Sequence, residues 1–377
     1  DVTTRGLRMA ESTDAAVEEK EVSSAASVDT DGFGDSAASE EVVLDVKNLQ
    51  THFTTRWGTV KAVDGVSYHV KRGETLGIVG ESGSGKSVTA LSLMRLVPSP
   101  PGKIVNGEVI LGGRNLLDLS EGEMTLVRGG EISIILQDPM QALNPVFSIE
   151  NQVGEAIKIH QGLKGEALWD KIVDSLRKVR IPAPETRAKD YPHQLSGGMR
   201  QRVVGAIGIS SAPAVIIADE PTTSLDVTIQ AQILDLLQRL QEEFHMAVLL
   251  ITHDLGVVAE VADHVAVMYA GKIVETSPTD QLFANPRHPY TRGLLRSIPH
   301  LDRQVDRLEV IPGRVPEATA FPPGCRFAPR CPLAEDSCRS RTAELIDCGD
   351  GHYVDCWKHD VLEPSQVGPS QESVNDG

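Results

Sequence analysis

A phosphate-binding loop is predicted by eight consecutive residues. Residues 80–87 read Gly-Glu-Ser-Gly-Ser-Gly-Lys-Ser and fit the pattern G-x-x-x-x-G-K-[ST]. Glycines let the backbone turn so that successive N–H groups point at phosphate oxygens, and the helix that follows presents its positive end to the same anion. Lys86 would reach the β- and γ-phosphates, and Ser87 would ligate Mg²⁺. The other expected phosphate contacts are Gly80, Ser82, Gly83, Ser84 and Gly85.

A pair of carboxylates supplies the second half of a nucleotide site. Asp219 and Glu220 directly follow the apolar run 214–218. Such a run predicts a buried strand, and active sites of open α/β sheets gather at the carboxyl ends of their strands. Asp219 would hold Mg²⁺ through water, and Glu220 would polarise the attacking water as general base. The sequence therefore predicts phosphoryl transfer to water.

A second anion-binding helix start is predicted near residue 196. Leu195, Ser196, Gly197 and Gly198 open a predicted helix, whose first N–H groups and dipole favour a negative ligand. Two phosphate-binding helix ends of one chain are not expected to reach one nucleotide from the same side. We therefore expect a dimer in which each protomer completes the site of the other.

The elements that must position these residues alternate between strands and helices, which argues for an α/β fold with a mostly parallel sheet covered on both faces. Apolar runs predict strands at 42–46, 66–70, 75–79, 131–136, 214–218, 247–251 and 264–268. Helical spacing of apolar residues predicts helices at 87–96, 150–180, 203–209 and around 229–240.

Composition separates a folded centre from acidic ends. The 377 residues are 40% hydrophobic, and of the formal net charge of −17 much comes from residues 1–41, which hold eleven acidic and three basic side chains. We expect a disordered tail at 1–40, with room for a short helix at 15–21, and a second disordered tail at 361–377. The acidity makes a nucleic-acid partner unexpected.

No apolar run approaches the ~20 residues of a membrane-spanning helix, and the N-terminus lacks the layout of a secretory signal. These observations predict a soluble, cytoplasmic protein.

Six motifs in one order resemble those of the ATP-binding subunits of ABC transporters, and the resemblance covers about residues 42–360. The matches are Walker A at 80–87, the Q-loop at Gln137, the signature at 195–199, Walker B at Asp219 and Glu220, the D-loop at 224–226 and the H-loop at 252–254. The D-loop reads Ser-Leu-Asp where Ala-Leu-Asp is commoner, so only Asp226 is carried over. The resemblance implies a P-loop ATPase domain with a helical subdomain.

This family implies a head-to-tail dimer that sandwiches two ATP molecules between Walker A of one protomer and the signature of the other. Gln137 would sense Mg²⁺ and the attacking water and connect to the membrane subunits, and His253 would contact the γ-phosphate. An aromatic residue upstream of Walker A usually stacks on adenine. Phe53 is the first expectation for that role and Trp57 the second.

The subfamily and its substrate class are indicated by the C-terminal part of the chain. Residues 285–295, 311–313 and 321–325, together with 137–145, resemble oligopeptide and dipeptide importer ATPases. This implies peptide uptake with a peptide-binding protein, two permeases and a homologous, non-identical ATPase, at the cytoplasmic face of the membrane. Nickel importers share much of this pattern and stay an alternative. Repair and translation ATPases fit less well, because no coiled coil is inserted and only one nucleotide domain is present.

All five cysteines lie between Cys325 and Cys356, and four of them form the pattern C-x5-C-x6-C-x17-C: Cys325, Cys331, Cys338 and Cys356. An iron–sulfur cluster, zinc and free thiols are all compatible with clustered cysteines in a cytosolic chain, although zinc knuckles favour closer spacing. The importer ATPases that the chain resembles carry a 4Fe–4S cluster here. Residues 351–357 match their Gly-His-x-x-x-Cys-Trp pattern, which favours Cys356 over Cys348, and a structural role is expected.

The expected division of the chain has four parts. An ATPase domain spans 41–285 and contains the helical subdomain at about 140–200, and a C-terminal region with the cysteines spans 286–360. The two tails, 1–40 and 361–377, complete it.

Overall fold

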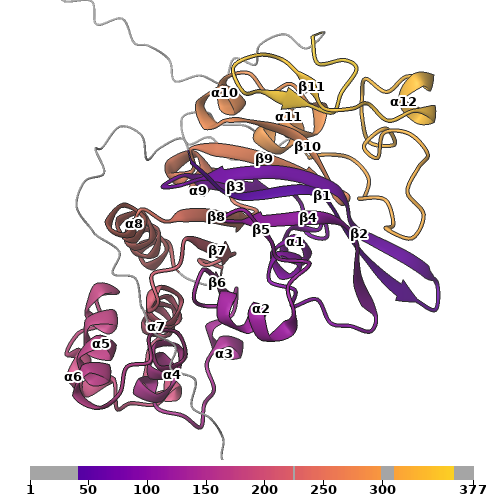
Figure 1. Cartoon of the computed structure of the whole chain (residues 1–377). Coiled ribbons are helices and arrows are strands. Elements are labelled where there is room, and N and C mark those ends of the chain that lie inside the picture. Colours follow the sequence, from indigo (N-terminus) through magenta and orange to yellow (C-terminus); the bar gives the residue numbers. More distant parts are fainter. Residues whose placement is uncertain (1–40, 224–225, 299–309, 361–377) are drawn as a thin grey trace, which may run out of the picture.

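The computed structural model describes residues 41–223, 226–298 and 310–360 (Figure 1). Both expected tails, the short helix expected at 15–21 and D-loop residues 224–225 lie outside the described residues. In the described part of the chain, no helix combines the length and the apolar character that a membrane crossing requires.

An eight-stranded sheet forms the centre, in the order β11-β12-β10-β9-β3-β8-β7-β6. Strands β9, β3, β8, β7 and β6 pair in parallel, and β10, β12 and β11 extend the sheet antiparallel. Every residue of β3, β7 and β8 is buried, as expected for parallel strands covered on both faces. The strands are β3 (Thr75–Val79), β6 (Ile132–Ile135), β7 (Val215–Asp219), β8 (Ala247–Thr252), β9 (His264–Tyr269), β10 (Lys272–Pro278), β11 (Ile346–Asp347) and β12 (Tyr353–Val354).

A second, antiparallel sheet has the order β2-β1-β4-β5. Its strands are β1 (Val42–Thr55), β2 (Gly58–Lys71), β4 (Gly102–Leu111) and β5 (Arg114–Asn115). The sequence predicts only the apolar ends of β1 and β2, whereas each of these strands is 14 residues long. The remainder was missed because one face of this sheet is polar and exposed, and register shifts interrupt the alternation of side chains.

The helices fall into three groups. Helices α1 (Lys86–Leu93) and α2 (Glu121–Val127) lie beside the antiparallel sheet, and α8 (Val227–Phe244) and α9 (Leu255–Val261) pack on the parallel strands. A helical layer lies at one end of the molecule in Figure 1 and consists of α3 (Pro139–Ala142), α4 (Ile149–Gln161), α5 (Gly165–Lys178), α6 (Pro184–Arg187), η1 (Pro192–Gln194) and α7 (Gly197–Ile209). The C-terminal helices are α10 (Thr279–Ala284), α11 (Pro289–Arg296) and α12 (Asp336–Ser340).

The predicted helical stretch 150–180 is two helices in the structure. Gly162 ends α4 with φ +66°, a left-handed conformation that glycine adopts without steric cost. The chain then turns into α5, so that both helices pack against α7 in one apolar core.

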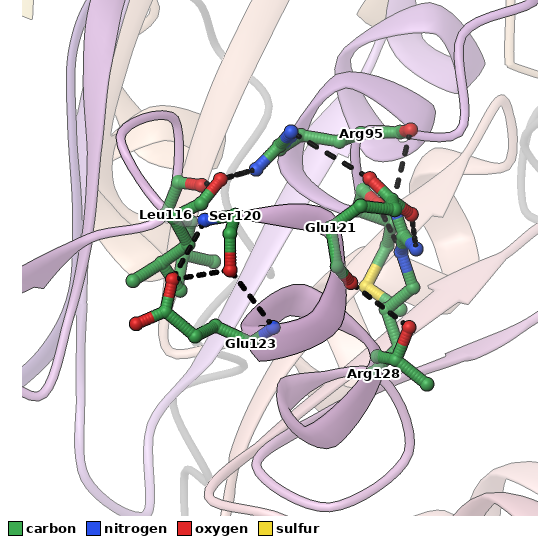
Figure 2. Close-up of polar contacts among 9 residues, drawn as sticks. Arg95, Leu116, Ser120, Glu121, Glu123 and Arg128 are labelled. Atoms are coloured by element: carbon green, nitrogen blue, oxygen red, sulfur yellow. Dashed lines mark hydrogen bonds and ion pairs between the residues drawn. The ribbon is translucent and has the colours of Figure 1, made fainter.

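A polar network fixes the far end of α1 (Figure 2). The Arg128 guanidinium donates to the carbonyls of Met94 (2.8 Å) and Arg95 (3.3 Å), which close the last turn of the helix. Arg95 and Arg128 both pair with Glu121, and Ser120 caps the start of α2. A cation at the carbonyl end of a helix complements the helix dipole. The helix that begins at the predicted phosphate loop is therefore anchored at its other end.

Candidate active site

The predicted phosphate loop leaves the buried strand β3 through backbone conformations that require glycine. Gly80 has φ +156° and Gly85 has φ +108°. A Cβ atom at Gly80 would lie 2.1 Å from the carbonyl oxygen of Met268, and one at Gly85 would lie 2.3 Å from that of Ala62. Any larger residue at either position would therefore collide with backbone and displace the loop.

Lys86 is held at this loop by its own backbone. The ammonium donates to the carbonyls of Gly80 (2.8 Å) and Glu81 (3.2 Å), and the residue is 5% exposed. Burial lowers the pKa of Lys86, whereas the nearby carboxylates of Glu220 and Asp219 act in the opposite direction. The cation is therefore placed close to the loop N–H groups and to the predicted carboxylates.

Ser87 and Asp219 meet at the end of β7. The Ser87 hydroxyl donates to Oδ1 of Asp219 at 3.1 Å. Burial raises the pKa of Asp219, and the Ser87 hydrogen bond opposes that change. Mg²⁺ in phosphate sites typically takes one or two carboxylates, with phosphate oxygens and water as its other ligands, and this donor pair fits that chemistry. Among the described residues, no group of three or more His, Cys, Asp or Glu residues is placed to hold a metal ion alone.

Glu220 is the centre of a cluster of polar side chains. Its Oε2 accepts hydrogen bonds from Gln137 Nε2 and from the Thr223 hydroxyl, both at 2.9 Å, and its Oε1 lies 3.4 Å from Nδ1 of His253. Glu220 adopts φ +47°, while its N–H donates to the carbonyl of Ile251 at 2.8 Å. Left-handed backbone at a non-glycine residue is unfavourable and is concentrated at functional sites.

Thr223 is a member of this cluster that the motifs did not predict. Its hydroxyl comes three residues after Glu220 and fixes the same carboxylate oxygen that Gln137 contacts. The signal was present as a Pro-Thr-Thr run directly after the two carboxylates. A threonine three residues after a carboxylate can reach it with a local side-chain hydrogen bond.

Topology explains why residues far apart in the sequence converge here. Gly80 follows β3, Gln137 follows β6, Glu220 follows β7 and His253 follows β8, and these four strands are neighbours in the parallel part of the sheet (Figure 1). Their carboxyl ends share one edge, where ligands bind in open α/β sheets.

The Ser-Gly-Gly segment lies in the helical layer. Ser196 caps α7 by accepting from the N–H of Met199 at 3.4 Å, and Leu195 anchors the turn with 4% exposure. Ser196 and Gly197 are exposed. Within the described residues, no hydrogen bond joins 195–198 to the phosphate loop. Asp226, the D-loop residue carried over from the sequence, caps α8 by accepting from the N–H of Ile229 at 3.0 Å.

The two aromatic candidates for adenine differ in their surroundings. Phe53 is half-buried in β1, where its ring covers Gly102 so closely that a Cβ there would lie 2.8 Å from it. Trp57 lies in the β1–β2 turn, is 74% exposed and stacks with the guanidinium of Arg56, 3.9 Å from the ring centre. The indole face is therefore far more accessible than the phenyl ring.

Four of the five cysteines surround one small cavity of about 20 Å³, which Phe327 and Trp357 also line: Cys325, Cys331, Cys338 and Cys356. Cys348 is not part of this lining. Burial raises the pKa of the Cys325 thiol to about 11 and that of Cys356 to about 12.

Comparisons with known proteins match both parts of the chain. The family model "ABC transporter" matches residues 63–223, and "Oligopeptide/dipeptide transporter, C-terminal region" matches residues 274–338. The oligopeptide transport ATP-binding protein AppD of Bacillus subtilis is 48% identical and is aligned over 84% of this chain and 97% of its own length. The dipeptide transport ATP-binding protein DppD of the same organism is 49% identical, over 85% and 96%.

A solved structure extends the likeness to the fold. A dimeric ATP-binding cassette in a post-hydrolysis state with ADP and Pi has a TM-score of 0.56 and 28% identity, covering 63% of this chain and 98% of its own. The α/β fold of an ABC-type nucleotide-binding domain, expected from the motifs, is therefore confirmed. The chain belongs to the ATP-binding subunits of oligopeptide and dipeptide ABC transporters, and it is an ATPase of that family.

Proposed function

We propose that Glu220 is the general base of ATP hydrolysis and that the chain is the motor subunit of a peptide importer. The observation that carries this proposal is the cluster of Gln137, Thr223 and His253 around the Glu220 carboxylate, beside Asp219. Glu220 would take a proton from the attacking water, and His253 would steady the γ-phosphate.

The rest of the phosphate site follows from the loop. We assign the triphosphate to the loop N–H groups and Lys86, together with Gly80, Ser82, Gly83, Ser84, Gly85 and Ser87. Ser87 and Asp219 would hold Mg²⁺, with Gln137 close by, and the cation supplies neutralisation of phosphate charge when it is bound.

The signature segment completes the site of a second protomer in this proposal. Support comes from the exposure of Ser196 and Gly197 at the start of α7, in a layer without hydrogen bonds to the chain's own described phosphate loop. The similarity to a dimeric cassette with ADP and Pi points the same way. Leu195, Gly198 and Asp226 would position this surface, and the partner would be a homologous, non-identical ATPase.

Permeases would dock beside the Q-loop. Met140, Val146 and Phe147 follow Gln137 closely in the chain and are 52%, 72% and 51% exposed. Exposed apolar side chains that cluster in one segment are typical of protein interfaces. A movement of this segment, caused by the two permease subunits, would then alter the hydrogen bond between Gln137 and Glu220.

For the adenine ring we place Trp57 first and Phe53 second, which reverses the order expected from the sequence. The reason is exposure: the Trp57 indole is accessible, whereas the Phe53 ring is packed over Gly102. Aromatic stacking requires a free ring face.

We propose that the four cysteines around the cavity hold a 4Fe–4S cluster as a structural group. The shared cavity and the position of Cys348 outside it support this choice of Cys325, Cys331, Cys338 and Cys356. The cysteine spacing also favours a cluster over a single zinc ion, because zinc sites typically have more closely spaced Cys pairs.

Iron content tests the cluster. Cys325→Ser should remove iron and brown colour from anaerobically purified protein, whereas the matched variant Cys348→Ser should keep both. Zinc in equimolar amount in the wild-type protein would contradict the assignment.

Peptides are the proposed cargo, because the relatives described above are named for oligopeptide and dipeptide transport. Nickel is the alternative. We propose that the protein lies peripherally at the cytoplasmic face of the membrane and that a peptide-binding protein is a further partner. We also propose an ATPase domain at 41–285, with the helical subdomain at 140–200, and a C-terminal region at 286–360.

Reconstitution tests the whole proposal. The ATPase pair, two permeases and binding protein in vesicles should take up labelled peptide only with ATP, and nickel should not compete. For the isolated chain, the hydrolysis rate per molecule should rise when the second ATPase is added. A full rate from a protein that light scattering shows to be monomeric would contradict the composite site.

A further inference from the structure

An ion pair joins the phosphate loop to the cysteine-bearing segment. Both oxygens of Glu81 accept from Arg330, with Nη1–Oε2 at 2.6 Å and Nη2–Oε1 at 3.0 Å. Glu81 is the second residue of the phosphate loop, and Arg330 directly precedes Cys331. This bidentate geometry fixes both the orientation of the Glu81 carboxylate and its distance from the Arg330 guanidinium.

Arg330 is itself held in place before it reaches the loop. Its side chain is 4% exposed, its Nε donates to the carbonyl of Pro312 at 2.9 Å, and its Nη2 donates to that of Ile311 at 3.3 Å. Pairing with Glu81 raises the pKa of Arg330. A buried guanidinium whose donors are satisfied is a rigid support rather than a mobile surface charge.

The backbone of Glu81 is fixed from the same direction. Its N–H donates to the hydroxyl of Tyr290 at 2.9 Å, and its carbonyl accepts from Lys86 at 3.2 Å. Tyr290 is fully buried against Tyr269 and Phe327, with ring centres 4.6 and 5.4 Å away. Three groups of Glu81 are thus bound, two of them by residues of the C-terminal part of the chain.

We infer that Arg330 is a positioning residue of the ATPase: through Glu81 it holds the phosphate loop and Lys86 in the arrangement that receives the triphosphate, with Tyr290 fixing the adjoining N–H. Arg330 contacts the loop and not the reacting atoms. Its loss therefore weakens nucleotide binding and leaves the chemical step at saturation nearly unchanged. This inference rests on the proposed binding of phosphate by residues 80–87.

The test uses the assembled transporter with Arg330→Met. We expect KM for ATP to rise about tenfold, which corresponds to about 1.4 kcal/mol, while kcat stays within about twofold, because the ion pair orders the loop and does not contact the reacting atoms. Glu81→Gln removes the same ion pair by changing its more exposed partner. If Arg330→Met does not fold, Glu81→Gln should still raise KM for ATP and leave kcat within about twofold. Arg330→Lys should recover part of the affinity.

The matched control is Arg326→Met. Arg326 lies in the same turn of the chain and pairs with Asp64 of β2 instead of the loop. The Arg326→Met variant should lower the melting temperature as Arg330→Met does. It should change KM for ATP by less than about twofold. Hydrogen exchange should accelerate across residues 80–87 in Arg330→Met and not in the control.

Two outcomes separate the inference from the function on which it rests. If Lys86→Ala abolishes nucleotide binding while Arg330→Met and Glu81→Gln lower only the melting temperature, the positioning role is wrong and the phosphate site stands. If Lys86→Ala leaves nucleotide binding intact, the phosphate site itself is wrong.

Discussion

The nucleotide site and the C-terminal region are built by different means. The nucleotide site stands on β3, β7 and β8, whose residues are all buried and whose register is fixed by main-chain pairing. The described residues 310–360 contain only two two-residue strands and one five-residue helix. Short main-chain pairing of β12 with β10 attaches this region to the ATPase, together with two ion pairs, Arg326 with Asp64 and Arg330 with Glu81.

This difference shows what positions the side chains in each region. Parallel strands place residues at a sheet edge whatever the details of the surface, so Glu220 and His253 meet through topology. The C-terminal region depends on individual contacts, such as the buried Glu275, which accepts from His352 at 2.7 Å and from the N–H of His288 at 3.0 Å. Substitutions at the strand edge should therefore change the chemical step, whereas substitutions in the C-terminal region should change stability or, at Arg330, nucleotide binding.

The largest expected effect is on the chemistry of the strand edge. Glu220→Gln should lower kcat by about 10²–10⁴-fold, because general-base catalysis contributes that much. ATP binding should persist, and the closed dimer should accumulate with ATP. Turnover is read from phosphate release and the dimer from size-exclusion chromatography. Hydrolysis at the wild-type rate in the assembled complex would remove Glu220 as the base.

The next effect concerns pH and the C-terminal region. Burial lowers the pKa of His288 to about 4, with Glu275 acting in the opposite direction. Between pH 6.5 and 4 the unfolded chain therefore binds a proton that the folded chain refuses, so stability should fall by up to about 3 kcal/mol as pH drops.

His288→Asn provides the control for this pH effect. An asparagine can still cap α11, as His288 does by accepting from the N–H of Tyr290 at 3.0 Å. Denaturant midpoints should then fall less steeply between pH 6.5 and 4. An unchanged slope would show that His288 does not carry the dependence.

Two valines compare the packing of the regions directly. Val215 in β7 and Val354 in β12 are both fully buried. Val215→Ala should cost about 2 kcal/mol of unfolding free energy, because a cavity between long strands cannot collapse. Val354→Ala should cost about half as much, since a two-residue strand can relax. Equal costs in urea unfolding would mean that the C-terminal region is as rigid as the central sheet.

The smallest effect is expected at the adenine. Trp57→Ala should weaken ATP binding about fivefold, since aromatic contacts contribute about 0.5–1.5 kcal/mol. Phe53→Leu should change it by less than about twofold and lower the melting temperature instead. A fluorescent ATP analogue measures both. A larger loss of ATP binding in Phe53→Leu than in Trp57→Ala would show that Phe53 stacks on the adenine ring.

The sequence was most informative where backbone burial dominates. Strands β3, β6, β7, β8 and β9 were predicted within one or two residues, because parallel strands covered on both faces read as continuous apolar runs. Strand β4 was missed because its Asn-Gly pair reads as a turn and its exposed face is polar.

Contacts between distant side chains could not be predicted. Glu81 and Arg330 are 249 residues apart, and neither the loop pattern nor the cysteine pattern indicates their pairing. The phosphate motif specifies glycines, Lys86 and Ser87 and leaves position 81 open. Residues that act through one another are therefore visible only in the folded chain.

The hydrogen bonds of Glu220 decide which of its two carboxylate oxygens is open to water. Gln137 and Thr223 both donate to Oε2, and a carboxylate oxygen has only two lone pairs to offer. A water molecule can use that oxygen only after one donor has left. Since Gln137 belongs to the segment that we assign to the permeases, we expect a movement of this segment to free Oε2 for water, while Oε1 stays near His253.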